Sequence, residues 1–328
     1  MNKLAGTCCL VTGGAGFVGS TIVDQLLTAG ASEVRVIDNF VRGSWSNLAW
    51  ARSQGGVKVI EGDIRDASLV NRATQGVDYV FHQAALRITR CAEAPREAVE
   101  VLIDGTLNVL EAALDHKVKK VVAASSASVY GEPSYLPIDE SHPFNNRTMY
   151  GAGKIAVEQM LLALHDTSGL HYIALRPFNI YGPRMDVTGV YTEVLIRWLD
   201  AIEANKPPLI FGDGSQSMDF VYVEDVARAN LLAVQSDLSN ETFNVGTGVQ
   251  TSLNELCRLL LSITGSSMQP EYREARRVAN VQRRCAAVEK ADKMLGFRAT
   301  VSLAEGLRQL VRWWQAVKAM SAATVEAS

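Results

Sequence analysis

Residues 7–19 read TCCLVTGGAGFVG, a short apolar run that leads into a glycine-rich turn. Gly13, Gly16 and Gly19 have the spacing that lets a backbone approach a pyrophosphate, which then lies on the free N–H groups and the positive dipole end of the next helix. A glycine triplet is also found in simple tight turns between a strand and a helix. The surrounding sequence has to decide between these interpretations.

Short apolar runs alternate with helical patterns through the first half of the chain. Beyond the first run, strands are predicted at 34–37, 57–60, 79–83, 121–124 and 172–175. The segments between them carry apolar residues at helical spacing, as in Val101, Leu107, Leu110 and Leu114. This rhythm predicts repeated β-α-β units and an α/β fold with a Rossmann-type, doubly wound parallel sheet.

The rhythm loosens after about Gly182, which predicts a smaller C-terminal α/β lobe. A helix is expected to begin at Ser252, where Glu255 completes the spacing of a capping box. A last helix is expected over 302–317. The predicted organisation is a dinucleotide-binding domain at 1–182, a substrate-binding lobe at 183–320 and a tail at 321–328, with strands at about 209–245 that can return to the main sheet.

Composition sets aside several classes of partner. The 328 residues carry a net charge of −3 with scattered charges, so neither nucleic acid nor an anionic membrane surface is an expected partner. The five cysteines include no C-x-x-C pair and no spacing that suits zinc, which indicates reduced thiols, a cytoplasmic protein and no metal site. No targeting segment and no apolar run of roughly 18 residues is apparent.

Asp38 supports a dinucleotide site at the glycine turn. It ends the second predicted strand, 19 positions after Gly19. A carboxylate at this place can accept hydrogen bonds from both hydroxyls of a ribose, and it repels a 2′-phosphate. We therefore expect NAD rather than NADP. Residues after the third and fourth strands can line the same site, although a simple strand-ending turn also explains them. The expected cofactor-binding residues are Gly13, Gly16, Phe17, Val18, Asp38, Asn39, Phe40, Ser44, Asp63, Ile64, Gln83, Ala84, Ala85, Leu86, Tyr150, Lys154 and Pro177.

Tyr150 and Lys154 form a candidate acid–base pair. Their spacing places both on one face of a predicted helix, where an ammonium favours the phenolate and makes the tyrosine a usable proton acceptor. The serine-rich turn at 125–131 leaves the fifth strand at the carboxyl edge of the sheet, and its Ser126 can share a hydrogen bond with a substrate oxygen. The simpler alternative is a partly exposed tyrosine beside a solvated lysine.

Together these motifs resemble the extended short-chain dehydrogenases/reductases, and within them the NAD-dependent nucleotide-sugar epimerases and dehydratases of the UDP-glucose 4-epimerase type. The resemblance covers nearly the whole length from Leu10 to Trp314. Besides the glycine turn, the serine turn and the Tyr150/Lys154 pair, it rests on DI at 63–64, HQAA at 82–85, RPFNIYGP at 176–183, FGDG at 211–214, DF at 219–220, DVA at 225–227 and FNVG at 243–246.

The resemblance implies a shared first step, in which Tyr150 takes the proton of the sugar C4 hydroxyl while the C4 hydride passes to NAD. Lys154 is then its electrostatic partner, and Ser126 orients the C4 oxygen. The similar 4,6-dehydratases carry an Asp-Glu pair at the positions of Ala127 and Ser128, and the similar UDP-glucuronate decarboxylases usually carry Glu at the second. The resemblance therefore implies a UDP-hexose 4-epimerase. A dehydratase, a decarboxylase and a non-catalytic NAD-binding scaffold or sensor are the alternatives.

For the nucleotide sugar, the resemblance nominates Arg87, Ser126, Asn179, Phe211, Gln216 and Arg277, of which Asn179 and Arg277 are expected at the diphosphate. It also implies a homodimer through helices at about 94–116 and 150–168.

Three positions depart from the family pattern. Met218 replaces an arginine, Leu102 replaces an asparagine, and Arg284 stands where the family adjusts the space around the C2 substituent. Arg87, Arg90 and Arg284 leave two interpretations open, contact with a carboxylated sugar or solvated surface positions.

Overall fold

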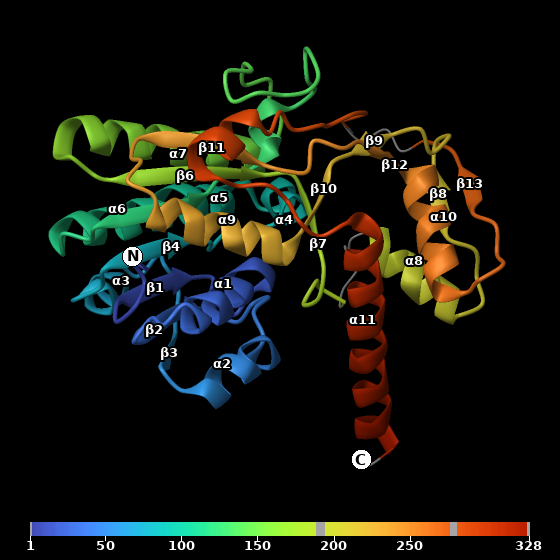
Figure 1. The fold of residues 1–328 in the computed structure, drawn as a ribbon, viewed down its shortest axis with the longest axis horizontal. Helices are drawn as coiled ribbons and strands as arrows, with labels where there is room; N and C mark the ends of the chain where they lie inside the picture. Colours follow the sequence, from blue (N-terminus) through green and yellow to red (C-terminus); the bar gives the residue numbers. More distant parts are fainter. Residues whose placement is uncertain (1, 188–193, 276–280, 327–328) are drawn as a thin grey trace.

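The computed structural model describes residues 2–187, 194–275 and 281–326, and its main body is built on one parallel sheet. Seven strands follow the order β11-β6-β5-β4-β1-β2-β3, with parallel pairing between all neighbours. The predicted doubly wound α/β fold is confirmed (Figure 1). The strands are β1 (Cys8–Thr12), β2 (Glu33–Asp38), β3 (Val57–Glu61), β4 (Tyr79–His82), β5 (Lys120–Ala124), β6 (Tyr172–Pro177) and β11 (Glu241–Val245).

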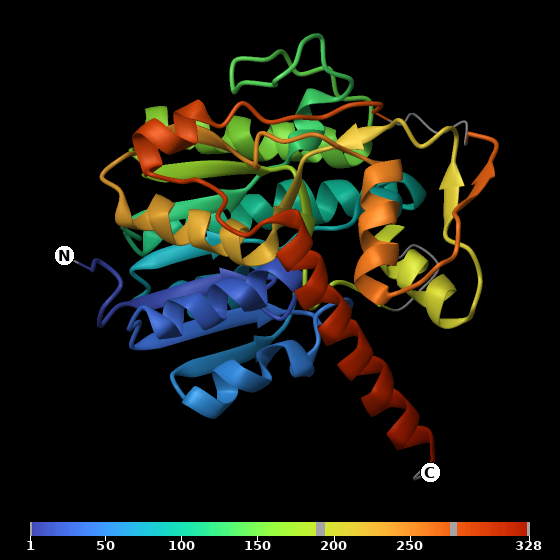
Figure 2. The same ribbon diagram turned by 45° about the vertical axis from the view of Figure 1, so that its right-hand side comes forward.

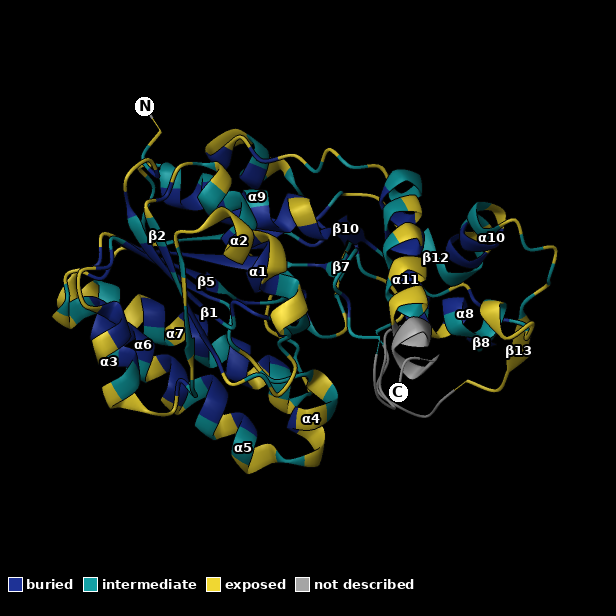
Figure 3. Cartoon of the chain, turned by 90° about the horizontal axis from the view of Figure 1, so that it is seen from below, coloured by how far each residue is buried: buried dark blue, intermediate teal, exposed yellow. Residues whose placement is uncertain are grey.

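Helices cover both faces of this sheet, and alternate residues of each strand supply the two cores. In β1, Cys9 and Val11 pack with the helices α1 and α9, whereas Leu10 packs on the opposite face with α3, α6 and α7. Figure 3 shows the buried strands between helices whose outer faces are exposed. The helices of this body are α1 (Phe17–Thr28), α2 (Ala49–Gln54), α3 (Ala67–Thr74), α4 (Ile88–Glu93), α5 (Pro95–Val99), α6 (Gly105–Asp115), α7 (Met149–Ser168) and α9 (Val223–Gln235).

Short helical turns complete the body. They are η1 (Trp45–Leu48), η2 (Glu100–Asp104), η3 (Ala127–Tyr130) and η4 (Ala291–Leu295). Of these, η2 and η4 are π-helical, and η2 joins α5 to α6.

A second lobe lies beside the carboxyl edge of the sheet, with its own apolar core around Trp198, Leu260 and Trp314 (Figures 1 and 2). Its helices are α8 (Val194–Glu203), α10 (Leu253–Thr264) and α11 (Leu303–Glu326). Three two-stranded pairs lie outside the main sheet: β7 (Asn179–Tyr181) with β10 (Phe220–Tyr222), β9 (Ser217–Met218) with β12 (Thr251–Ser252), and β8 (Leu209–Phe211) with β13 (Glu271–Arg273). Of the later strands, β11 pairs with the main sheet, whereas β8, β9 and β10 pair elsewhere.

Two helix boundaries show how far local sequence signals reach. The predicted capping box is confirmed, since Ser252 Oγ accepts from the Glu255 N–H at 3.1 Å and the Glu255 carboxylate accepts from the Ser252 N–H at 2.8 Å. The last helix was predicted too short. It continues past residue 317 to Glu326 through a run rich in alanine, the residue with the highest helix propensity.

Within the described residues, no helix combines the length and the hydropathy needed to span a bilayer.

A buried ion pair joins strand β6 to helix α7 near the carboxyl edge of the sheet. Arg176 of β6 holds both carboxylate oxygens of Glu158 on α7, with Nε–Oε1 at 2.8 Å and Nη2–Oε2 at 2.5 Å. Ser125, directly after β5, also donates to Glu158, and Arg176 Nη1 donates to the Tyr130 hydroxyl at 2.8 Å. The side chains of the pair are only 5% and 6% exposed. This network therefore fixes α7 against the ends of β5 and β6.

We expect Glu158→Ala to lower the free energy of unfolding by about 3–5 kcal/mol, because it leaves the Arg176 guanidinium buried without its counter-charge. Urea denaturation followed by circular dichroism measures the loss. Glu271→Ala is the matched control, since it breaks a pair with Arg273 whose partners are about half exposed. Equal losses in the two variants would show that the buried pair has no special role.

Candidate active site

In the turn between β1 and α1, the backbone comes so close to other segments that there is no room for a side chain at Gly13. Gly13 has φ +67°, and a Cβ on it would lie 2.8 Å from the Ala84 amide nitrogen. The cap residue of α1, Gly16, has no side chain to accept from the first-turn N–H groups, and that turn holds no acidic residue. The amides of Phe17 and Val18 therefore begin the helix as donors to an anion.

Asp38 lies buried at the end of β2, next to this turn. Its Oδ2 accepts from the Ala15 N–H and its Oδ1 from the Phe40 N–H, both at 2.9 Å. Burial raises the pKa of the carboxyl, and the backbone donors oppose this rise. A carboxylate can accept about four hydrogen bonds, so it keeps capacity for a ribose diol. Gly43 leaves room beside it, because a Cβ there would lie 2.6 Å from Asp38 Oδ1. This geometry fits a dinucleotide.

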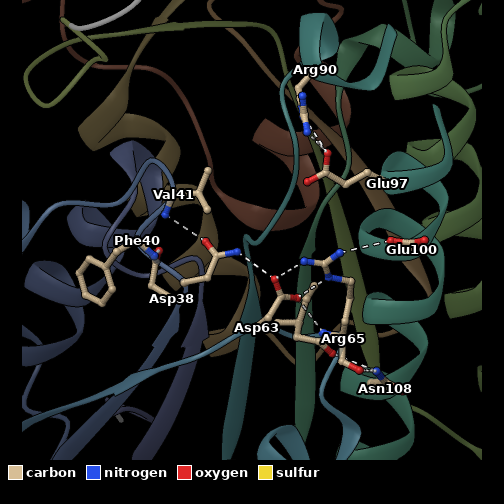
Figure 4. A network of polar contacts seen from close by, with 11 residues as sticks. Asp38, Phe40, Val41, Asp63, Arg65, Arg90, Glu97, Glu100 and Asn108 are labelled. Atoms are coloured by element: carbon tan, nitrogen blue, oxygen red, sulfur yellow. Dashed lines mark hydrogen bonds and ion pairs between the residues drawn. The ribbon is translucent and has the colours of Figure 1, made fainter. Parts of the chain in front are cut away.

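The predicted residues after β2 and β3 lie next to each other. Asn39 Nδ2 donates to Asp63 Oδ2 at 2.9 Å. Hydrogen bonds from Arg65 are the main reason that the pKa of Asp63 falls to about 2, and Arg65 also reaches Glu100 (Figure 4). Asp63 is thus a fixed anion at the edge of the site. Its neighbour Ile64 is buried, and the Ile64 carbonyl accepts from Asn108 Nδ2 at 2.9 Å.

The loop after β2 is ordered by its own contacts. Phe40 stacks on Trp45 with ring centroids 4.5 Å apart, and Ser44 Oγ accepts from the Ser46 N–H at the start of η1. Figure 4 shows Phe40 and Val41 on the loop that follows Asp38.

The segment 83–86 follows β4 and meets the glycine turn. His82, the last residue of β4, bonds to the hydroxyls of Thr12 at 2.8 Å and Thr106 at 2.9 Å. Burial lowers the His82 pKa to about 3, so the ring is neutral and links β4 to β1 and α6 without a charge. Gln83 donates to Asn230 at 3.1 Å, and the Ala84 N–H donates to Thr12 Oγ1 at 3.3 Å.

The other two residues of this segment, Ala85 and Leu86, continue toward α4, and Leu86 packs in one cluster with Tyr150. Pro177 ends β6 at the same edge of the sheet.

Ser126, Tyr150 and Lys154 come together at this edge. Ser126 lies close enough to the Tyr150 phenol for its hydroxyl to lower the pKa of that phenol. Lys154 Nζ lies 5.8 Å from the centre of the Tyr150 ring and donates to the Ala124 carbonyl at 2.5 Å. Thr148 fixes the start of α7, because its hydroxyl accepts from the Gly151 N–H at 3.1 Å. Tyr150 therefore stands in the first turn of a capped helix, facing the serine turn.

Burial dominates the electrostatics of this group. It raises the pKa of Tyr150, and the hydrogen bond from Ser126 opposes that rise. Burial also lowers the pKa of Lys154 to about 8, which leaves the amine mostly charged at neutral pH. The arrangement supplies a hydroxyl donor, a phenol and a cation within one corner of the site.

Two of the departures from the family pattern are apolar contacts. Leu102 is buried and packs with Cys91 and Tyr150. It also approaches Gly153 so closely that a Cβ there would lie 2.6 Å from Leu102 Cδ1. Met218 packs against the core of the second lobe. Both positions thus contribute packing where the family pattern has a polar side chain.

The predicted substrate residues lie on several elements. Asn179 is on β7, and Phe211 ends β8, where its carbonyl accepts from Gln216 Nε2 at 2.9 Å. Arg87 pairs with Asp186 at 3.2 Å, beside Arg42, which reaches the same carboxylate. Arg277 lies outside the described residues.

Arg87, Arg90 and Arg284, for which the sequence left two interpretations, have different surroundings in the structure. Arg90 forms an exposed pair with Glu97, as Figure 4 shows, and Arg87 is bound to Asp186. Arg284 is partly buried and interacts electrostatically with Tyr150. Sequence alone did not distinguish it from its exposed neighbour Arg283, because its burial depends on segments far away in the chain.

Comparison with known proteins identifies the family of the chain. The model of the NAD dependent epimerase/dehydratase family matches residues 9–246. A UDP-glucose 4-epimerase of Mycolicibacterium smegmatis is 36% identical over 309 residues, which cover 93% of this chain and 98% of that protein.

Two solved structures give the same result. A UDP-N-acetylglucosamine 4-epimerase from Methanobrevibacter ruminantium, in complex with UDP-N-acetylmuramic acid, superposes with a TM-score of 0.91 at 33% identity, covering 95% of this chain and 99% of that one. The UDP-glucose 4-epimerase of Thermus thermophilus, in complex with NAD, gives 0.84 at 34% identity and covers 94% and 99%. The chain belongs to the NAD dependent epimerase/dehydratase family and is a sugar-nucleotide epimerase whose cofactor is NAD.

Proposed function

We propose that this protein is a UDP-hexose 4-epimerase in which Tyr150 is the acid–base residue. The observation that carries the proposal is the grouping of Ser126, Tyr150 and Lys154 beside the dinucleotide turn, with Ala127 and Ser128 in the two positions after Ser126. Ala127 is 2% exposed and packs among apolar residues, so it offers neither an acid nor space for one. An elimination or decarboxylation that needs a carboxylate there has no group to perform it.

Ser126, Tyr150 and Lys154 have different roles in the proposed proton transfer. The chemistry that bound NAD supplies is reversible acceptance of the hydride on sugar C4. Tyr150 takes the proton of the C4 hydroxyl, Ser126 holds the C4 oxygen through its hydroxyl, and the charge on Lys154 favours the phenolate. The resulting 4-keto sugar turns over in the site, and Tyr150 then returns the proton to the C4 oxygen of the epimer.

The remaining predicted residues complete the proposed site. Gly13, Gly16, Phe17 and Val18 are positioned for the pyrophosphate of the cofactor, and Asp38 for its adenosine ribose. Asn179 and Arg277 are proposed for the diphosphate of the substrate. The binding of UDP-N-acetylmuramic acid by one relative supports UDP as the nucleotide.

We also propose a cytoplasmic homodimer that joins through α5, α6 and α7. Three aliphatic side chains stay more than a third exposed on these helices: Val99 at 37%, Leu107 at 36% and Leu162 at 37%. A second copy on this face would remove them from water.

We expect the purified protein to interconvert a UDP-hexose and its C4 epimer. The test uses UDP-glucose deuterated at C4, with UDP-N-acetylglucosamine and UDP-glucuronate as further substrates, followed by NMR and mass spectrometry. Retention of deuterium at C4 of the epimer is the expected outcome, because the hydride is recycled within the site. Loss of water or carbon dioxide, or net accumulation of NADH, would contradict a 4-epimerase.

We expect Tyr150→Phe to reduce turnover by about 10²–10⁴-fold, the range for removal of a general acid–base group. Its content of bound NAD should not change, because the fold and the glycine turn are untouched. Tyr135→Phe is the control, since that phenol is exposed and bonds to Asp139. Unchanged turnover in Tyr150→Phe would remove Tyr150 from the mechanism.

We expect Gly13→Ala to lose bound NAD, because the added methyl group collides with the Ala84 backbone. Gly76→Ala is matched in backbone strain, with φ +73°, but its Cβ would meet nothing within 4 Å. Chromatography of the nucleotide released from each denatured protein gives the NAD content. Equal NAD content in the two variants would show that the close approach at Gly13 is not needed for the cofactor.

A further inference from the structure

Arg284 stands in an extended segment that is held from both sides. Its N–H donates to the Ser217 carbonyl at 2.9 Å, and the carbonyl of Cys285 accepts from the Ile138 N–H at 2.7 Å. Successive side chains of an extended segment point in opposite directions. Arg283 is accordingly exposed, whereas Arg284 is directed inward and partly buried.

The inward guanidinium has an unused donor. Arg284 Nε is fully buried and finds no hydrogen-bond partner among the described residues. The acidic group that acts on it is Glu132, which is itself exposed and accepts from the Gln282 N–H at 3.3 Å. An arginine with a buried, unpaired donor is costly unless a ligand supplies the acceptor.

The position of Arg284 indicates which part of a substrate it would meet. Arg284 lies close enough to Tyr150 that its charge lowers the pKa of the phenol, against the burial that raises it. In the proposed reaction this phenol faces C4 of the sugar. The diphosphate is attached at C1, on the opposite side of the ring, so an anion at Arg284 belongs to the sugar itself. A planar guanidinium pairs best with a carboxylate, through two parallel hydrogen bonds.

We propose that Arg284 binds a carboxylate carried by the sugar ring, so that the preferred substrate is an acidic nucleotide sugar. The inference deepens the proposed 4-epimerase and rests on it for the orientation of the sugar. Two substituents next to C4 provide this chemistry. One is a carboxylate on an ether at C3, which also adjoins the C2 substituent beside which the family resemblance places Arg284. The other is a carboxylate at C5, as in a uronate.

Calorimetry on the full-length, NAD-loaded protein tests the proposal. UDP-glucuronate provides the carboxylate at C5, and UDP-N-acetylmuramate provides the carboxylate on an ether at C3. UDP-glucose is the reference with a neutral sugar, and UDP is the reference without a sugar. We expect the wild type to bind at least one acidic sugar more tightly than UDP-glucose. Arg284→Met should weaken that binding by about tenfold to hundredfold, as expected for a charge-assisted pair. It should change the binding of UDP-glucose by less than about threefold.

Arg283→Met is the matched control, because it removes the adjacent, exposed arginine from the same segment and should leave all four affinities unchanged. Arg284→Lys keeps the charge but loses the planar fork. It should recover only part of the affinity, and it serves as the test if the methionine variant does not fold.

The proposal is overturned if the wild type binds no acidic sugar better than UDP-glucose, or if Arg284→Met weakens acidic and neutral sugars equally. It is also overturned if Arg284→Met lowers turnover of every sugar without changing any affinity, since Arg284 would then act only on Tyr150. The deuterium experiment is independent of these outcomes. Epimerisation without acid preference rejects only this inference, and acid preference without epimerisation rejects only the 4-epimerase.

Discussion

The pair between Arg176 and Glu158 is the interaction on which the site depends. Neither charge could stay buried without the other, so β6 and α7 are held at a fixed distance. Ser125 joins the same carboxylate, which ties the end of β5 to both. Ser126 follows on that turn, and Tyr150 and Lys154 lie near the start of α7. One charge pair therefore helps to position three side chains of the site.

The site combines a few charged groups, such as Asp38, Asp63 and Lys154, with neutral groups and close backbone contacts. Burial keeps His82 uncharged between two threonine hydroxyls, and it lowers the pKa of Lys154 to about 8. A cation with a lowered pKa, next to a phenol with a raised one, responds strongly to any charge that develops between them. The leucine at position 102 adds apolar surface to this corner by packing against Tyr150. Electrostatic control thus comes from a few charges in a poorly solvated setting.

Local patterns predicted the strands of the main sheet because each is a short apolar run bounded by turns, and β1 to β6 lie within two residues of the predicted ranges. The capping box at Ser252 was predictable for the same reason, as its signal spans four residues. The pairing of late strands was not, because β8, β9 and β10 choose partners through contacts between distant segments. The contrast between Arg283 and Arg284 has the same origin, since it is set by Ser217 and Ile138. Sequence located the candidate site at the sheet edge but not the partners of its side chains.

The last strand of the main sheet has a consequence for how the chain must be made. β11 comes after the first part of the second lobe, from β7 to β10, and it pairs along β6 from Ile173 to Pro177. A ribosome that has released the chain only as far as β6 has therefore produced a sheet in which β6 is an edge strand, whose unpaired amides and carbonyls can recruit another strand. Phe243 and Val245, which belong to the core beneath that edge, are also still missing. The nascent protein is exposed to misassociation until about residue 245 has emerged, and splitting the gene between the two lobes would make this transient edge permanent.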